Sequence, residues 1–89
     1  MIEKEIAVVN RLGLHARAAA KLVHLAGSFR SQVTLCRDGE QVDGKSILGI
    51  LLLAVPQGTK LNLRCEGDDE QRAVDALTAL FAERFGEGE

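Results

Sequence analysis

The sequence has few aromatic residues: the 89-residue chain contains three phenylalanines and neither tryptophan nor tyrosine. Proteins that bind single-stranded nucleic acid stack its bases on aromatic side chains, and this chain has too few for such a platform. The formal net charge of −2 also argues against a protein that binds the phosphate backbone of a nucleic acid. We therefore expect no nucleic-acid partner.

The sequence also lacks a long hydrophobic run. The longest apolar stretch, residues 47–55, is interrupted by Gly49 and falls far short of the roughly 20 residues that a membrane-spanning helix requires. The first residues are mostly charged and contain no apolar core of a secretory signal. These features predict a cytoplasmic protein with no membrane partner.

Cysteine is rare, with Cys36 and Cys65 as its two occurrences. Cys36 falls on the outward face of its predicted strand, because Val33 and Leu35 take the inward face, whereas Cys65 falls on the inward face of another strand. Thiols on opposite faces of one sheet cannot form a disulfide, so we expect both to be free.

The remaining composition, with 46% hydrophobic and 27% charged residues, is that of a folded protein, and the length suits one domain over residues 1–89. Alternating apolar residues predict four strands, over residues 2–9, 32–37, 40–43 and 60–66. Asp38-Gly39 predicts a two-residue hairpin between the second and third strands.

Three helices are predicted between and after these strands. The first covers about residues 16–26 with Gly27 as its C-cap, and the second covers residues 47–55 before the turn at Pro56-Gln57-Gly58. The third opens at Gly67-Asp68-Asp69-Glu70, and Gly86 is expected to stop it. The order β-α-β-β-α-β-α predicts a two-layer α+β fold with an antiparallel sheet.

His15 lies between the turn at Gly13 and an alanine-rich run, where the first helix begins. Unpaired N–H groups and the positive end of the helix dipole gather there. Imidazole is nucleophilic near neutral pH, since its ordinary pKa is about 6.5, and a phosphorylated ring nitrogen is labile enough to pass the group onward. We expect His15 to carry a phosphoryl group stabilised by Arg17; the alternative is a histidine that only caps the helix.

The first predicted helix has a narrow polar face. Arg17, Lys21 and His24 fall within an arc of roughly 60°, and every other position is Ala, Val or Leu. The apolar arc is wider than packing on one sheet requires, so part of it is expected to face a partner. His24, in mid-helix on the polar face, is expected to be a solvated surface residue.

Residues 39–46 read G-E-Q-V-D-G-K-S and match the P-loop pattern letter for letter. The predicted hairpin already uses Gly39, and Glu40 and Asp43 would place negative charge in a phosphate cradle. A chain of this length also leaves little room for a doubly wound nucleotide-binding fold. We therefore interpret the match as coincidental.

Ser46 is placed to cap the helix that begins at Ile47. The functional alternative is a regulatory phosphosite, because the helix dipole favours a dianion at that position. Phosphorylation would put negative charge beside the apolar side chains of Ile47, Leu48, Leu51 and Leu52 and would repel an acidic partner.

Two motifs occur together: Gly13-Leu14-His15-Ala16-Arg17 before the alanine-rich helix, and Gly44-Lys45-Ser46-Ile47-Leu48-Gly49 later in the chain. With these motifs the chain resembles the HPr family, the histidine-containing phosphocarriers of the phosphoenolpyruvate-dependent phosphotransferase system. The resemblance implies an open-faced β-sandwich, in which three helices cover one face of a four-stranded antiparallel sheet.

The resemblance also implies a set of roles. His15 would accept a phosphoryl group on Nδ1 from phosphorylated enzyme I and donate it to a histidine of an enzyme IIA domain, with Arg17 contacting the group. Ser46 would be the site of an HPr kinase/phosphorylase in bacteria that have one. The partner surface would comprise Ala16, Ala20, Ile47, Leu48, Leu51 and Leu52.

Ala18 departs from many sugar-branch members of the family, which carry proline at that position. Alanine resembles the nitrogen-related NPr branch and single-HPr proteobacterial systems, so a mainly regulatory role is the alternative to sugar uptake. In either case we expect a monomeric, stoichiometric carrier rather than an enzyme, with no cofactor and no metal site.

Overall fold

A computed structural model of the protein describes residues 1–87. Its elements follow the predicted order, with a short 3₁₀ helix added at the end. They are β1 (Ile2–Ala7), α1 (Ala16–Gly27), β2 (Gln32–Arg37), β3 (Glu40–Asp43), α2 (Ile47–Leu53), β4 (Lys60–Glu66), α3 (Glu70–Ala82) and the 3₁₀ helix η1 (Arg84–Gly86).

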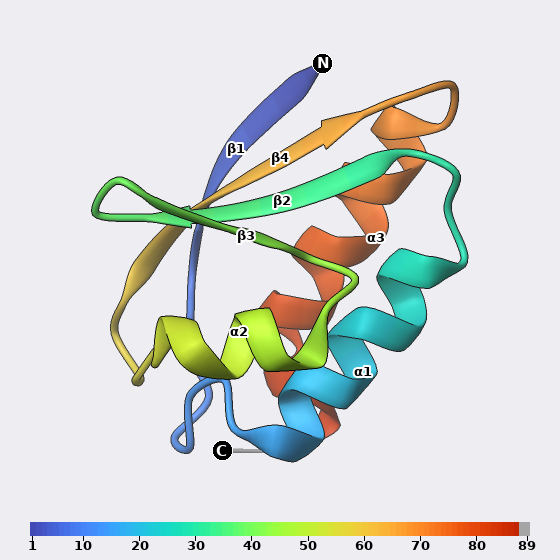
Figure 1. Ribbon diagram of the computed structural model, residues 1–89. Coiled ribbons are helices and arrows are strands. Elements are labelled where there is room, and N and C mark those ends of the chain that lie inside the picture. The colour runs from blue at the N-terminus through green and yellow to red at the C-terminus, as the bar shows by residue number, and fades with distance from the viewer. Residues whose placement is uncertain (88–89) are drawn as a thin grey trace.

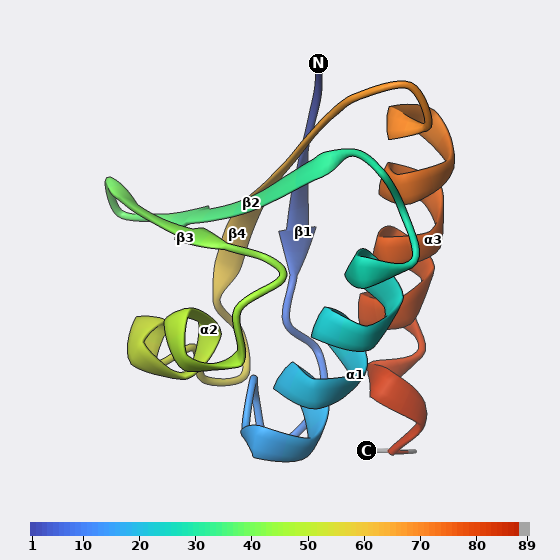
Figure 2. The same ribbon diagram turned by 45° about the vertical axis from the view of Figure 1, so that its right-hand side comes forward.

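The four strands form one antiparallel sheet in the order β1-β4-β2-β3, so β1 and β3 are its edges. The three α-helices lie on one side of this sheet, with α1 and α3 next to each other and α2 beside the start of α1 (Figures 1 and 2). The predicted α+β fold with an antiparallel sheet and a single helical layer is therefore confirmed.

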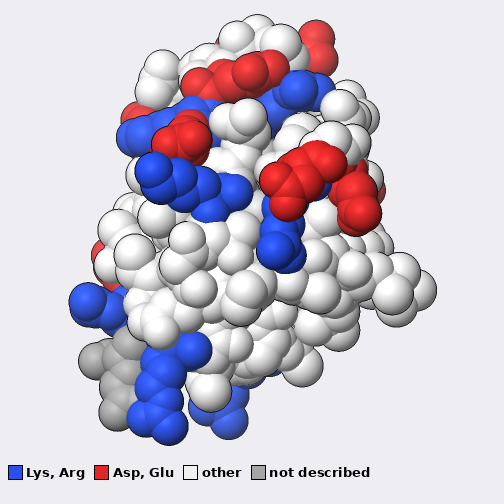
Figure 3. Space-filling view, turned by 90° about the vertical axis from the view of Figure 1, so that its left-hand side faces the viewer, with Lys and Arg blue, Asp and Glu red and all other residues white. Residues whose placement is uncertain are grey.

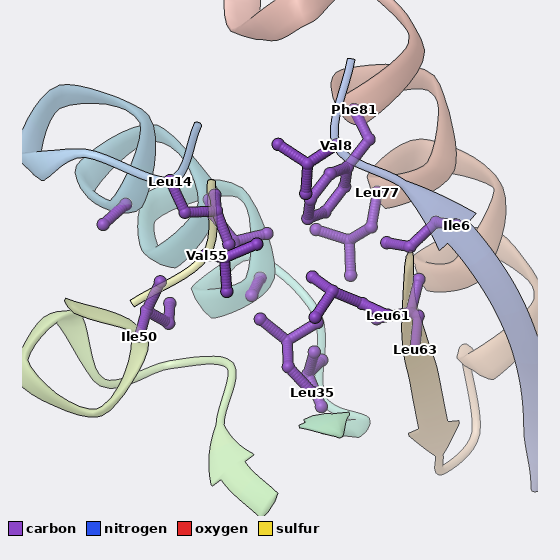
Figure 4. Close-up of a cluster of buried hydrophobic side chains, with 14 of the residues drawn as sticks. Ile6, Val8, Leu14, Leu35, Ile50, Val55, Leu61, Leu63, Leu77 and Phe81 are labelled. Atoms are coloured by element: carbon purple, nitrogen blue, oxygen red, sulfur yellow. The ribbon is translucent and has the colours of Figure 1, made fainter. Parts of the chain in front are cut away.

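The core fills the space between the sheet and the helices. Side chains from the inward face of the strands, among them Leu35, Leu61 and Leu63, meet Leu77 and Phe81 of α3 (Figure 4). Alternation along β4 explains this, since Leu61, Leu63 and Cys65 are buried while Lys60 and Asn62 are exposed.

The two cysteines occupy the positions that the alternation predicted. Cys65 is buried in the core, Cys36 is half-buried on the other face of the sheet, and both are free thiols. Burial raises the pKa of the Cys65 thiol, and the negative charges of Glu70 and Asp69 add to that effect.

The hairpin between β2 and β3 also follows the prediction. Asp38 and Gly39 have φ values of 50° and 84°, so both central residues are left-handed, as a type I′ turn requires. Arg37 pairs with Glu40 directly across this turn.

Three elements end at residues other than those predicted. β1 ends at Ala7 rather than Val9, because the backbone of Val8 bonds instead to Thr59 and Gly58, in the loop before β4. α2 ends at Leu53 rather than Val55, because Ala54 adopts a left-handed φ of 54°. Gly27 is the last residue of α1 rather than its cap, and Ser28 follows in a right-handed conformation.

The largest correction concerns the last helix, which Gly86 was expected to stop. α3 ends at Ala82, and Arg84 and Phe85 have φ values of 56° and 55°. This unfavourable backbone turns the Phe85 ring back into the core, where it is 1% exposed and packs edge-on against Phe81 at 4.9 Å between ring centroids.

At the opposite end of the molecule, Asp69 joins the start of α3 to the turn between α1 and β2. Its carboxylate accepts hydrogen bonds from the backbone N–H of Arg30 at 2.9 Å, and from the N–H and hydroxyl of Ser31 at 3.0 and 2.5 Å. The bonds from Ser31 and Arg30 lower the pKa of Asp69 from 3.8 to about 2.

The low pKa of Asp69 predicts that the fold loses stability in a specific range of acidic pH. Because the pKa of Asp69 is lower in the folded state, its contribution to stability is complete above pH 4 and is lost as the pH falls from about 4 to about 2. Asp69→Asn should therefore lower the urea midpoint at pH 7 and flatten its decline between pH 4 and 2. Asp68→Asn is the matched control, and an equal decline in both variants would contradict the assignment.

Candidate functional site

The loop between β1 and α1 is held against the loop between α2 and β4. The N–H of Leu14 donates to the carbonyl of Val55 at 2.9 Å, and Leu14 is buried. Gly13 has a φ of +68°, and a Cβ at this position would lie 2.4 Å from the Val55 oxygen. Only glycine fits this conformation and this close approach. The contact fixes where the chain enters α1.

His15 is the N-cap of α1, as the sequence predicted. Its backbone is extended, and its Nδ1 accepts a hydrogen bond from the backbone N–H of Arg17 at 3.3 Å. Because a backbone N–H can only donate, Nδ1 is the unprotonated ring nitrogen in this arrangement. The nucleophilic lone pair therefore lies at the positive end of the helix dipole.

The other ring nitrogen of His15 contacts the carboxylate of Glu87. Nε2 bonds to Oε2 of Glu87, and Nδ2 of Asn10 donates to Oε1 of the same carboxylate at 3.0 Å. The side chains of His15 and Glu87 are 27% and 12% exposed. Burial raises the pKa of Glu87, but the hydrogen bonds from Asn10 and His15, helped by the charge of Lys21, outweigh this effect and lower the pKa of Glu87 below 4.5.

Asn10 and Lys21 hold this arrangement together. Asn10 is fully buried, and its Nδ2 also donates to the carbonyl of Gly13 at 2.8 Å, which ties the entry loop to Glu87. Lys21, from the polar face of α1, donates to the carbonyl of Phe85 at 2.5 Å. The turn after α3 is thereby held against α1, which places Glu87 beside His15.

A pocket of about 320 Å³ opens beside this pair. It is lined by Arg11, Leu12, Arg17, Gly86 and Glu87, so the exposed Arg17 lies at its wall as well as at the start of α1. Figure 3 shows Lys and Arg side chains at this end of the molecule, while Asp and Glu gather mainly toward the other end. An anion at the start of α1 would therefore lie in a positive environment.

α2 presents an apolar surface next to the start of α1. Ser46 caps α2 by accepting a hydrogen bond from the N–H of Gly49 at 3.1 Å, as predicted. Four large apolar side chains are exposed on this short helix, Ile47 at 43%, Leu48 at 68%, Leu51 at 38% and Leu52 at 72%. Ala16 and Ala20 of α1 are also exposed. His24, on the polar face of α1, is exposed as the sequence predicted.

The segment that matches the P-loop pattern does not form a phosphate cradle. Gly39 belongs to the hairpin turn, and residues 40–43 form β3. Lys45, which would contact phosphates in a P-loop, donates instead to the carbonyl of Phe29 at 2.9 Å. The side chain of Asp43 accepts from the N–H of Lys45 at 2.8 Å.

Comparison of the sequence with known proteins identifies the family to which the chain belongs. A family model described as the PTS HPr component phosphorylation site matches residues 2–83. The chain belongs to the HPr family. It therefore shares the family's function, that of a phosphocarrier in the phosphotransferase system.

Individual members of the HPr family are similar over their whole length. The phosphocarrier protein HPr of Cupriavidus necator is 55% identical over 89 residues, which is 100% of both chains. A crystal structure of HPr-C-His from Thermoanaerobacter tengcongensis has a TM-score of 0.95 at 46% identity and covers 98% of each chain. A structure described as an HPr dimer from that organism has a TM-score of 0.79, covering 98% of this chain and 100% of that one.

Within this HPr-family fold, sequence patterns did not point to Glu87 or to the roles of Asn10 and Lys21. Glu87 lies 72 residues after His15, in a charged terminal segment where a glutamate is by default solvated. Burial of an asparagine cannot be read from its position in a loop. The structure describes no group of three or more His, Cys, Asp or Glu residues that could hold a metal ion within residues 1–87.

No helix among the described residues is both long enough and apolar enough to cross a membrane.

The close approach at Gly13 predicts a specific defect. Gly13→Ala should destabilise this HPr-family member by about 1–3 kcal/mol, because a left-handed alanine is strained and its Cβ would collide with the Val55 carbonyl. Urea unfolding measures this loss. Gly39→Ala is the matched control, since Gly39 has a φ of +84° but open space around it. Equal losses in the two variants would show that the loop contact contributes nothing.

Proposed function

We propose that His15 is the phosphorylation site and that Nδ1 is the atom that carries the phosphoryl group. The observation that supports this most directly is the position of Nδ1, which faces the backbone N–H of Arg17 at the start of α1. The unpaired N–H groups of a helix start and its dipole stabilise a bound phosphoryl group. His15 is only partly buried, so a donor and an acceptor can both reach the ring.

The partners that we propose are those that the resemblance to the HPr family implies. Phosphorylated enzyme I is the donor, a histidine of an enzyme IIA domain is the acceptor, and the protein acts as a stoichiometric carrier rather than an enzyme. The guanidinium of Arg17, at the wall of the pocket beside His15, would contact the transferred group with charge-assisted hydrogen bonds. Because phosphoryl transfer between histidines needs no cofactor from the carrier, we propose none.

The partner surface is proposed to comprise Ala16, Ala20, Ile47, Leu48, Leu51 and Leu52. Its support is the exposure of four large apolar side chains on a helix that lies next to α1. Such an exposed apolar cluster is typical of interaction sites. We propose that the carrier works as a monomer, with this surface open to one partner at a time.

Ser46 is proposed as a regulatory phosphosite for an HPr kinase/phosphorylase. A phosphate on its Oγ could still accept from the N–H of Gly49, so the cap of α2 would survive. The new charge would lie directly before Ile47 and Leu48 of the proposed partner surface. With Ala18 in the family's variable position, service of a nitrogen-branch enzyme IIA is the alternative to sugar uptake. The free thiols suit a reducing compartment, and we place the carrier in the cytoplasm.

The central test is phosphorylation by enzyme I and phosphoenolpyruvate. The wild-type protein should gain one phosphate that is labile in acid, because a phosphoramidate hydrolyses there, and His15→Ala should gain none. Mass spectrometry before and after acid treatment measures both properties. His24→Ala is the matched control and should be labelled as the wild type is. A label that survives acid, or that persists in His15→Ala, would exclude His15 as the carrier.

Arg17 can be tested in the same assay. Arg17→Glu should lower the rate of phosphoryl transfer about tenfold or more, because a hydrogen bond to a charged group contributes roughly 1.5–3 kcal/mol. Arg72→Glu changes the total charge equally but lies at the start of α3, and should transfer at the normal rate. If the two variants are slowed to the same extent, net charge rather than Arg17 determines the rate.

A further inference from the structure

His15 is held from both sides of its ring, and the two contacts are chemically different. Nδ1 accepts from a neutral backbone N–H of Arg17, whereas Nε2 faces the carboxylate of Glu87. A carboxylate can only accept at this position, so the proton of the neutral ring resides on Nε2. The second oxygen of Glu87 is held by Asn10, a residue that is fully buried.

We propose that Glu87 is a positioning residue for phosphoryl transfer: its carboxylate holds the proton on Nε2 of His15, and thereby keeps Nδ1 free to accept and later release the phosphoryl group. This inference rests on the proposed function, in which Nδ1 is phosphorylated. It adds a residue from the far end of the chain to the reaction.

The proton on Nε2 has a role in both directions of the transfer. On acceptance, the lone pair of Nδ1 forms a bond to the phosphorus of the donor's phosphohistidine, and the donor's P–N bond breaks with its electron pair returning to the donor ring. The His15 ring then carries the phosphoryl group on Nδ1 and a proton on Nε2. Its positive charge faces the Glu87 carboxylate.

On donation, the electron pair of the Nδ1–P bond returns to Nδ1 as the acceptor histidine bonds to phosphorus. With the proton retained on Nε2, His15 departs as neutral imidazole. Without that proton it would have to depart as imidazolate, a far more basic and therefore poorer leaving group. A carboxylate that holds the proton thus favours release.

Glu87 is suited to hold this proton without removing it. The hydrogen bonds from Asn10 and His15 lower the pKa of the Glu87 carboxyl despite its burial, which makes it a weak base. Within residues 1–87, the charged groups beside the pair are Arg11 from the entry loop and Arg17 and Lys21 from α1. Residues 54–59, packed against the entry loop, contain no titratable side chain.

The contact itself can be tested without phosphorylation. In ¹⁵N-labelled protein, the Nε2–H proton of His15 should give a detectable NMR signal that exchanges slowly with water, because Glu87 holds and shields it. Glu87→Ala should abolish this signal, and Glu83→Gln, which alters an exposed glutamate after α3, should leave it unchanged. A wild-type protein without the signal, or a Glu87→Ala variant that retains it, would overturn the proposal.

The role in transfer is tested with phosphorylated protein across a range of pH. Glu87→Gln and Glu87→Ala should release the phosphoryl group about tenfold more slowly than the wild type above neutral pH, the scale of a lost charge-assisted hydrogen bond. Near pH 5 the rates should converge, because solvent then supplies the proton. Both transfer to an enzyme IIA domain and hydrolysis in buffer are measured, since hydrolysis involves no partner.

Equal rates for wild type and both variants at every pH would overturn the role of Glu87. A slowing of the same size at every pH would also overturn it, because that pattern indicates a structural defect rather than loss of the proton. Failure of the proposed function is distinguishable: the wild type would then take no acid-labile phosphate, while the Nε2–H signal would still report the contact between His15 and Glu87.

Discussion

The approach of Gly13 to the carbonyl of Val55 is the constraint on which the rest of the site depends. A side chain at position 13 would collide with that oxygen, and the hydrogen bond from Leu14 to the same carbonyl sets the spacing. The chain can therefore leave β1, turn and enter α1 at one place only. His15 follows directly, so its position at the helix start is a consequence of backbone packing between two loops.

From this position the electrostatics follow. The chain carries a net charge of −2, yet the end of the molecule with the start of α1 presents Lys and Arg side chains (Figure 3). The helix dipole adds to their field. A phosphoryl group on His15 would be stabilised there without being enclosed, since the ring is 27% exposed. Moderate stabilisation and open access are what a carrier needs, because a group that is bound too tightly cannot be passed on.

Local sequence signals predicted most of the fold, for reasons the structure makes clear. The alternation of residues 60–66 and the Asp38-Gly39 turn are determined by neighbouring residues, so they can be recognised without the rest of the chain. Ser46 as a cap and His15 at a helix start are equally local. The segment that matches the P-loop pattern could be interpreted as coincidental for the same reason, because the hairpin signal that overlaps it is also local.

What could not be predicted depends on contacts between distant residues. α3 was expected to continue toward Gly86, but its end is set by the burial of Phe85 against Phe81, which compensates for two left-handed residues. The same turn also brings Glu87 back to α1. The sequence placed Lys21 only on the polar face of α1, and its hydrogen bond to Phe85 exists only once the turn is in place.

The position of Glu87 also depends on the strained turn that follows α3. Had α3 continued as a regular helix past Ala82, Glu87 would not occupy its present position beside Nε2 of His15. The left-handed Arg84 and Phe85 redirect the chain, Phe85 secures the new direction by burial, and Lys21 and Asn10 fix its last described residues. Backbone strain at one point of the chain thus places a carboxylate at another, and the core supplies the energy that maintains it.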